Sequence, residues 1–169
     1  YGTEWSILRI NKADQAVDFI DKTDGLSTVG LSGIQYHTGT DQLVIAYENS
    51  VIDLLPADGQ VTTLNQIANF SNFVGERSIN HILPDSDSTV LLAATYGVSQ
   101  LNLRRVEFSF TAFTGVPVRQ VARYQGFLYA ATEEGIYRIP ETNPNPQNFG
   151  NWALLGPETG FPPLYGSTN

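Results

Sequence analysis

Residues 118–139 read VRQVARYQGFLYAATEEGIYRI, and this stretch decides the fold. It holds three short, largely apolar runs, which are separated by Gln125-Gly126 and by Glu133-Glu134-Gly135. The last run alternates in polarity through Tyr137-Arg138-Ile139, a pattern typical of a sheet with two different faces. The stretch therefore predicts three consecutive short strands joined by tight turns.

The same pattern occurs twice more, and in every copy a fourth short run follows. The predicted strands are residues 33–36, 42–47, 50–55 and 60–64 in the first unit, 79–83, 90–95, 98–103 and 107–111 in the second, and 118–122, 127–132, 135–139 and 152–155 in the third. Ala46, Ala94 and Ala131 lie at the ends of the second strands, and we place them at equivalent positions. Their separations bracket the period of roughly 40–50 residues that is typical of β-propeller blades.

The segment before the first unit matches the second half of a further blade, because residues 6–10 and 16–20 flank a turn at 11–14. The predicted fold class is therefore all-β, a partial β-propeller of about three and a half four-stranded antiparallel blades. We divide the chain into a half blade at 1–28, blades at 29–70, 71–115 and 116–156, and a linker-like tail at 157–169.

Prolines interrupt the last predicted blade. Pro140, Pro144 and Pro146 exclude a central strand in this segment, because proline cannot donate a ladder hydrogen bond. We therefore predict an irregular excursion between the third and fourth strands of that blade. Beyond one helical turn near residues 64–70, we expect no helix.

The composition excludes some partners and sites. Nine Lys and Arg residues against 17 Asp and Glu residues give a net charge of −8, and the longest basic run is Arg104-Arg105. We expect no nucleic-acid partner, because binding a polyanion needs a basic surface. No apolar run reaches the roughly 18 residues of a membrane helix, so no direct membrane insertion is expected. The chain has no cysteine for a disulfide or thiolate site, and no methionine, which leads us to expect a processed or excised piece.

The sequence carries no catalytic signature. It lacks a nucleophile elbow, a phosphate-binding loop and a dinucleotide fingerprint, and His37 and His81 fall at non-equivalent places without evident partners. Asp85-Ser86-Asp87-Ser88 offers oxygen ligands for calcium but lacks the glycine and glutamate of a calcium loop, so a polar turn is predicted. We predict no catalytic residues, no metal, no cofactor and no enzymatic activity. A carbohydrate-active enzyme stays an alternative, because carboxylates are plentiful.

Binding residues are predicted at the centre and at one face of the propeller. First strands line the central channel of a propeller, so His81 and Arg119 are candidates that could meet there. Glu133 and Glu134 lie between a second and a third strand, where they could contact a cation or an amine. The simpler interpretations are blade packing or an ion pair for the first two residues, and solvated loop positions for the acidic pair.

Two sets of motifs resemble those of known propellers. Asp24-Gly25-Leu26-Ser27 ahead of Gly33-Ile34, together with residues 128–137, resembles the repeats of two-component-regulator propellers. Residues 43–55, LVIAYENSVIDLL, with the Ser78-Ile79-Asn80 entry to the next blade, are similar to the N-terminal β-propeller of PorZ-type proteins of the type IX secretion system in Bacteroidetes. The second resemblance covers nearly the whole chain.

This resemblance implies an exported protein of the bacterial periplasm or outer-membrane surface, which acts as a non-catalytic binding or assembly module. The implied partners are envelope secretion proteins, or glycans such as anionic lipopolysaccharide. A periplasmic sensor propeller of a two-component regulator is the alternative. The tryptophan of the L-W-I-G-T motif in sensor repeats is missing, since Leu43-Val44, Leu91-Leu92 and Leu128-Tyr129 occupy those places.

A partial ring leaves blade faces and strand edges open. We expect apolar positions such as Leu92 and Ala94 to lie near the open sides. Exposed edges invite pairing with another chain. The chain is therefore expected to self-associate, for example as two copies that complete one ring.

Overall fold

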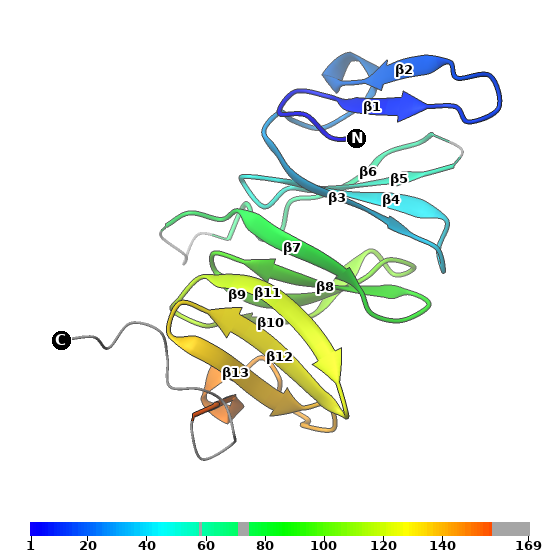
Figure 1. Cartoon of the computed structure of the whole chain (residues 1–169). Helices are drawn as coiled ribbons and strands as arrows, with labels where there is room; N and C mark the ends of the chain where they lie inside the picture. Colours follow the sequence, from blue (N-terminus) through cyan, green and yellow to red (C-terminus); the bar gives the residue numbers. More distant parts are fainter. Residues whose placement is uncertain (58, 71–74, 157–169) are drawn as a thin grey trace.

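Short antiparallel strands dominate the computed structural model, which describes residues 1–57, 59–70 and 75–156. They form three four-stranded sheets, in each of which neighbouring strands follow one another in the sequence, and one two-stranded sheet near the N-terminus. The sheets are stacked one after another along the chain (Figure 1). The prediction of an all-β partial propeller is confirmed.

We name the sheets in chain order. The N-terminal hairpin consists of β1 (Ile7–Ile10) and β2 (Val17–Ile20). Blade 1 consists of β3 (Leu31–His37), β4 (Gln42–Tyr47), β5 (Ile52–Pro56) and β6 (Thr62–Leu64). Blade 2 consists of β7 (Ile79–Pro84), β8 (Thr89–Ala94), β9 (Gly97–Asn102) and β10 (Glu107–Phe113). Blade 3 consists of β11 (Val118–Tyr124), β12 (Phe127–Thr132), β13 (Gly135–Pro140) and β14 (Ala153–Leu154).

The helices of the described part are two short 3₁₀ turns, η1 (Lys22–Asp24) and η2 (Phe149–Asn151). Asp21 caps η1, because its carboxylate accepts a hydrogen bond from the Thr23 N–H at 2.6 Å. Hydrogen bonds from the Thr23 side chain and backbone lower the pKa of Asp21. Neither 3₁₀ turn is long or apolar enough to cross a membrane, and this part of the chain has no other helix that is.

The excursion predicted in blade 3 is confirmed. β13 ends at Pro140, and the chain then runs through turns and η2 before β14 begins at Ala153. Three parts of the predicted organisation lie outside the described residues. They are the predicted tail at 157–169, Asp58 between the predicted strands 50–55 and 60–64, and residues 71–74 at the start of the predicted second blade.

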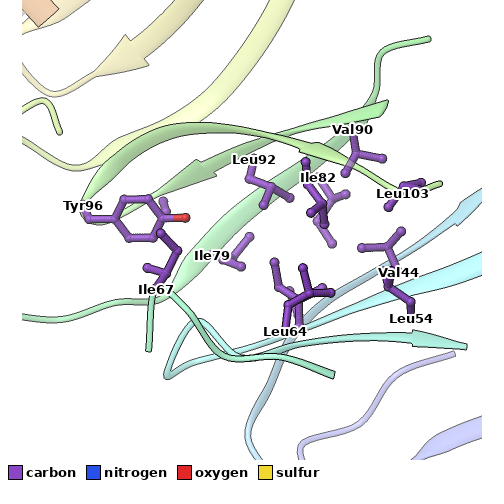
Figure 2. Close-up of a cluster of buried hydrophobic side chains, with 14 residues drawn as sticks. Val44, Leu54, Leu64, Ile67, Ile79, Ile82, Val90, Leu92, Tyr96 and Leu103 are labelled. Carbon is purple, nitrogen blue, oxygen red and sulfur yellow. The ribbon is translucent and has the colours of Figure 1, made fainter. Parts of the chain in front are cut away.

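The apolar side chains of the described residues pack in three clusters, one at each junction between consecutive sheets. The cluster between blades 1 and 2 includes Val44, Leu54, Leu64, Ile79, Val90 and Leu92 (Figure 2). The cluster between blades 2 and 3 includes Leu91, Ala93, Val98, Leu128, Ala130 and Trp152. The cluster between the hairpin and blade 1 includes Ile7, Leu26, Ile45 and Tyr47. Blades 1 and 2 therefore bury both faces, which explains why their second strands are apolar from Leu43 to Tyr47 and from Val90 to Ala94.

The equivalence of Ala94 with Ala46 and Ala131 is wrong by one residue. The first strand of each blade contains a β-bulge, where its ladder with the second strand skips one residue. The residue after this bulge pairs with Ala46 in blade 1, Ala93 in blade 2 and Ala131 in blade 3. Ala94 therefore faces back toward blade 1, since a shift by one residue turns a side chain to the other face of a sheet.

The expectation that Leu92 and Ala94 lie near the open sides is also wrong. Both side chains are 0% exposed, because blade 2 is covered by blade 1 on one face and by blade 3 on the other. Within the described residues, the faces without a neighbouring sheet are the outward face of the hairpin and that of blade 3.

Candidate binding surface

The first strands of the three blades lie side by side. β3 contacts β7, and β7 contacts β11, although no ladder joins the sheets (Figure 1). Among the described residues, each of these strands pairs on one side only, with the second strand of its own blade. Their other edges form the inner surface of the partial ring, where the sequence predicted binding residues.

A β-bulge occurs at the same place in every first strand. The ladder skips Ser32 in β3, Asn80 in β7 and Arg119 in β11, and bulges re-aim the side chain that they release. The Asn80 side-chain amide donates to the Val118 carbonyl at 2.7 Å and so ties blade 2 to blade 3. The Ser32 hydroxyl oxygen is buried and has no hydrogen-bond partner within the described residues. The three bulges thus place polar side chains at matching positions around the ring.

Arg119 pairs with Glu133 rather than with His81. Its guanidinium donates to the Glu133 carboxylate, which lies in the turn between β12 and β13. The two side chains are 57% and 70% exposed, so this pair contributes little to stability and stays open to a partner. The possible meeting of Arg119 and His81 in the channel is replaced by an ion pair within blade 3.

His81 lines a small cavity between the first strands of blades 1 and 2. The cavity measures about 210 Å³, and Gly33, Gln35 and Asn80 also line it. The Nδ1 atom of His81 is buried and has no hydrogen-bond partner among the described residues. The structure therefore places His81 on the inner surface, as predicted, but in a different inter-blade junction from Arg119.

Glu134 makes a local contact. Its carboxylate accepts a hydrogen bond from the Tyr137 hydroxyl at 2.9 Å. Burial and this hydrogen bond raise the pKa of Tyr137. Glu133 and Glu134 are both exposed in the turn between β12 and β13, and Glu133 is the one that pairs with Arg119. We call Arg119, Glu133 and Glu134 the rim of blade 3. Three of the four predicted binding residues thus belong to one rim of blade 3.

Asp85 and Arg123 form a clamp between blades 2 and 3 that the sequence did not predict. The Asp85 side chain is only 3% exposed, and it accepts hydrogen bonds from the Arg123 guanidinium and from the Gln100 amide at 2.8 Å. Arg123 also pairs with Glu141 at 3.1 Å. The hydrogen bond to Asp85 is the main reason why the pKa of Arg123 is raised. Asp85 is thus held by protein donors in a polar turn rather than in a calcium loop.

We expect Arg123→Met to lower the free energy of unfolding by about 1–2 kcal/mol, because it leaves the buried Asp85 carboxylate without its cation. Urea titrations followed by the fluorescence of Trp152, which is buried at the same junction, measure the change. Arg105→Met is the matched control, since its pair with Glu107 is exposed and should contribute less than about 0.5 kcal/mol. Equal losses for both variants would contradict the clamp.

A second cross-blade contact lies at the turns after the first strands. His37 is buried, and its Nδ1 accepts a hydrogen bond from the Thr40 N–H at 3.2 Å. Its Nε2–H is then the donor to the Ser86 carbonyl in blade 2, at 2.8 Å. Gly39 permits the close approach, because a Cβ there would lie 2.4 Å from the Asp87 carbonyl oxygen. His37 is therefore a structural residue of the junction between blades 1 and 2.

Asp53 is the centre of a buried polar network in blade 1. Its carboxylate accepts hydrogen bonds from the Ser27 N–H at 2.8 Å, the Tyr47 hydroxyl at 2.7 Å and the Thr63 hydroxyl at 2.7 Å. The Ser27 hydroxyl is a further donor. The network anchors the linker between the hairpin and blade 1 to β5. The sequence signal was available, since Asp53 is the one charged residue in the apolar run of residues 51–55.

We expect the Tyr47 hydroxyl to make stability depend on alkaline pH. Burial and the hydrogen bond to Asp53 raise the pKa of Tyr47, so above about pH 10 the unfolded chain loses this proton while the folded chain keeps it. Stability contributed by Tyr47 is therefore present below pH 10 and is lost as the pH rises, by up to about 1.4 kcal/mol per pH unit.

Urea titrations between pH 8.5 and 11 test the effect of Tyr47. The variant Tyr47→Phe should lose less stability over this range than the wild type, whereas Tyr124→Phe, at an exposed tyrosine, should behave like the wild type. Tyr96, whose pKa burial raises to about 12, supplies a similar slope in all three proteins. Identical slopes for the wild type and Tyr47→Phe would refute the expectation.

Within residues 1–57, 59–70 and 75–156, no three His, Asp or Glu side chains gather as a metal site requires. The carboxylates of Asp53 and Asp85 both accept hydrogen bonds from protein donors. Asp53 accepts them from the hydroxyls of Tyr47 and Thr63, and Asp85 pairs with the Arg123 guanidinium. The arrangement is chemically suited to recognition by hydrogen bonds and charges along the inner surface and its rim.

Comparisons with known proteins agree with the fold. A family model that describes the N-terminal β-propeller domain of PorZ, of the type IX secretion system, matches residues 3–153. Among solved structures, PorZ of Porphyromonas gingivalis, an essential bacterial surface component of that system, matches with a TM-score of 0.77 and 23% sequence identity. The match covers 90% of this chain and 20% of that chain, so this chain spans about a fifth of the solved relative. No curated protein sequence matches the chain.

Proposed function

This chain belongs to the family of N-terminal β-propeller domains of PorZ, the type IX secretion component, and on this premise we propose that it is a non-catalytic module that binds other components of the secretion apparatus. We place it on an exported protein, in the periplasm or at the outer-membrane surface. Its partners are envelope secretion proteins or anionic lipopolysaccharide. Of the classes considered from the sequence, the secretion component is the one that the family match supports.

The observation that carries the proposal is the row of first strands with a bulge at the same place in each. Asn80 and Arg119 are exposed at matching positions of blades 2 and 3, and Ser32, whose hydroxyl is buried, holds the same position in blade 1. The apolar contacts between the sheets hold all three in fixed positions. Such a surface meets a partner without reorganising, which lowers the entropic cost of binding. The exposed charges of Arg119 and Glu133 lie at its rim.

The charge of the chain distinguishes the two partner classes. A net charge of −8 repels an anionic polysaccharide over the distance of a Debye length, which is about 8 Å at physiological salt. A protein surface that contributes lysine or arginine residues near Glu133 and Glu134 is attracted instead. The electrostatics therefore favour secretion proteins over lipopolysaccharide as direct partners of this domain.

Recovery of partners from envelope extracts tests the proposal. The tagged full-length protein should retain type IX secretion subunits, and the triple variant Arg119→Ala, Glu133→Ala, Glu134→Ala should retain them several-fold less. The control Arg105→Ala, Glu107→Ala removes an equally exposed ion pair elsewhere on the surface. Recovery of no secretion subunit by the wild-type protein would overturn the proposed function. Equal recovery by the triple variant and the control would overturn the assignment of the rim.

A further inference from the structure

Gly33 leaves a space in the wall of the inner surface. This glycine lies within β3, and its φ is not among the positive values that favour glycine. A Cβ at Gly33 would meet only the Ile82 side chain within 4 Å, at an ordinary distance of 3.7 Å. At Gly39 and Gly97, in contrast, a Cβ would clash with backbone atoms. Neither the backbone conformation nor close packing among the described residues therefore requires glycine at position 33.

The space beside Gly33 is the cavity of about 210 Å³ that His81 also lines. A glycine inside a strand costs stability relative to alanine, and it often marks a place where a ligand or another backbone approaches closely. The lining comes from β3 and β7, the first strands of two neighbouring blades. The cavity therefore does not depend on where the stack of sheets ends.

The lining combines apolar side chains with an amide. Ile79 and Ile82 are 2% and 7% exposed and belong to the cluster between blades 1 and 2 (Figure 2). Gln35 lies on the same face of β3 as Gly33, two residues further along the strand. Its amide nitrogen donates to the Tyr36 carbonyl at 2.9 Å, which leaves the amide oxygen as an acceptor. None of the described lining residues is lysine, arginine, aspartate or glutamate, so the cavity suits an uncharged group with an apolar body.

Two buried polar atoms beside the cavity lack partners. The hydroxyl oxygen of Ser32, which directly precedes Gly33, and the Nδ1 atom of His81 have no hydrogen-bond partner among the described residues. Nearly all buried polar groups in folded proteins are hydrogen-bonded to protein or to ordered water. This part of the inner surface is therefore incomplete without a water or a bound partner.

The unpaired edges of β3 and β7 flank the cavity. Within the described residues, each strand pairs only with the second strand of its own blade, so its other edge offers main-chain donors and acceptors. A peptide segment that approaches such an edge forms main-chain hydrogen bonds with it, and pockets beside the edge select its side chains. A strand edge next to a cavity of side-chain size therefore favours a peptide over a free small molecule.

We propose that the cavity at Gly33 receives one uncharged, largely apolar side chain from a loop of a secretion protein. The side chain packs on Ile79 and Ile82, the main chain of the loop lies along the edges of β3 and β7, and the Gln35 amide oxygen accepts a hydrogen bond from the loop. The inference rests on the proposed function and names what the inner surface recognises. The rim of blade 3 attracts the partner by charge, whereas the cavity selects one side chain by size.

Filling the cavity tests the inference. In the recovery of partners by the tagged full-length protein, Gly33→Val should retain type IX secretion subunits about tenfold less than the wild type, and Gly33→Ala should give an intermediate result. Gly33→Ala should unfold at or above the urea concentration of the wild type, because its Cβ meets no clash. Ser109→Val, at the exposed bulge residue of β10, adds the same side chain elsewhere and should leave recovery unchanged.

A second variant tests the hydrogen bond to the loop. Gln35→Leu keeps the approximate size of the side chain but removes the acceptor, so recovery should fall several-fold. Recovery of no secretion subunit by the wild-type protein would overturn the proposed function itself. If the wild type does recover them, undiminished recovery by Gly33→Val and Gly33→Ala would overturn this inference alone. A small molecule that native mass spectrometry finds on the purified wild-type protein, and that Gly33→Val loses, would also overturn it, because the cavity would then hold a free ligand.

Discussion

Replacing Gly97 by alanine is expected to lower the free energy of unfolding by about 3 kcal/mol or more. Gly97 begins β9 with a φ of +140°, a conformation that other residues rarely adopt. A Cβ at this position would lie 2.0 Å from the carbonyl oxygen of Ala112 on β10, which is backbone of the paired strand and cannot turn away. The strain therefore combines an unfavourable dihedral angle with a backbone clash in the most buried sheet.

Thermal unfolding measures the Gly97 effect, and Gly126→Ala separates its two causes. Gly126 also has a positive φ, of 79°, but a Cβ there would meet no atom within 4 Å. This control should cost only the dihedral penalty, about 1–2 kcal/mol. At roughly 2–4 °C per kcal/mol for a chain of this size, Gly97→Ala should melt at least about 6 °C below the wild type. A melting temperature for Gly97→Ala at or above that of Gly126→Ala would show that the clash is relieved cheaply.

The strand pattern of this chain could be predicted from local sequence because each strand carries its own signal. The apolar second strands, the alternating third strands and the turn residues between them marked the three blades, and the prolines after β13 marked the excursion. These signals depend on periods of two and on turn chemistry, which act over a few residues. The half blade was visible for the same reason.

The incorrect predictions concern the face of the sheet on which a side chain lies and the contacts between residues far apart in the sequence. The sequence matches Ala94 with Ala46 and Ala131 because each lies near the end of an apolar run, whereas the residue after the bulge of the first strand pairs with Ala93 in blade 2. The sequence predicts Leu92 near an open side because it does not indicate which blade is central. Arg123 and Asp85 lie 38 residues apart, and nothing local indicates that they meet.

For the candidate binding residues too, the position in the repeat could be predicted from the sequence, but the partner of the side chain could not. That His81 and Arg119 lie on first strands followed from the repeat, and the structure places both strands on the inner surface. That Arg119 turns to Glu133 depends on the bulge, which releases the side chain from the ladder. The bulges in β3, β7 and β11 leave no mark in composition or periodicity, since the extra residue is a different type each time, Ser32, Asn80 or Arg119.

The other large effect is expected for Asp53→Ala, which should destabilise the chain by about 3 kcal/mol. Asp53 is 0% exposed, and its removal leaves the buried Tyr47 hydroxyl and the half-buried Ser27 N–H without an acceptor, while the hydroxyls of Ser27 and the exposed Thr63 keep their hydrogen bond to each other. A buried donor without an acceptor costs about 1–3 kcal/mol, and water that enters the space left by the carboxylate offsets part of the sum. The free energy of unfolding from urea titration measures the loss.

The location of the damage distinguishes the Asp53 network from a general packing defect. Asp53 joins the linker at Ser27 to β5, so amide exchange at Ser27 should accelerate in Asp53→Ala, while amides of β12 in blade 3 should keep their protection apart from the global change. Asp18→Ala is the matched control, because that carboxylate pairs with Arg9 at 2.9 Å on the surface and should contribute less than about 1 kcal/mol. Equal losses for Asp53→Ala and Asp18→Ala, or unchanged exchange at Ser27, would mean that the network does not hold the hairpin to blade 1.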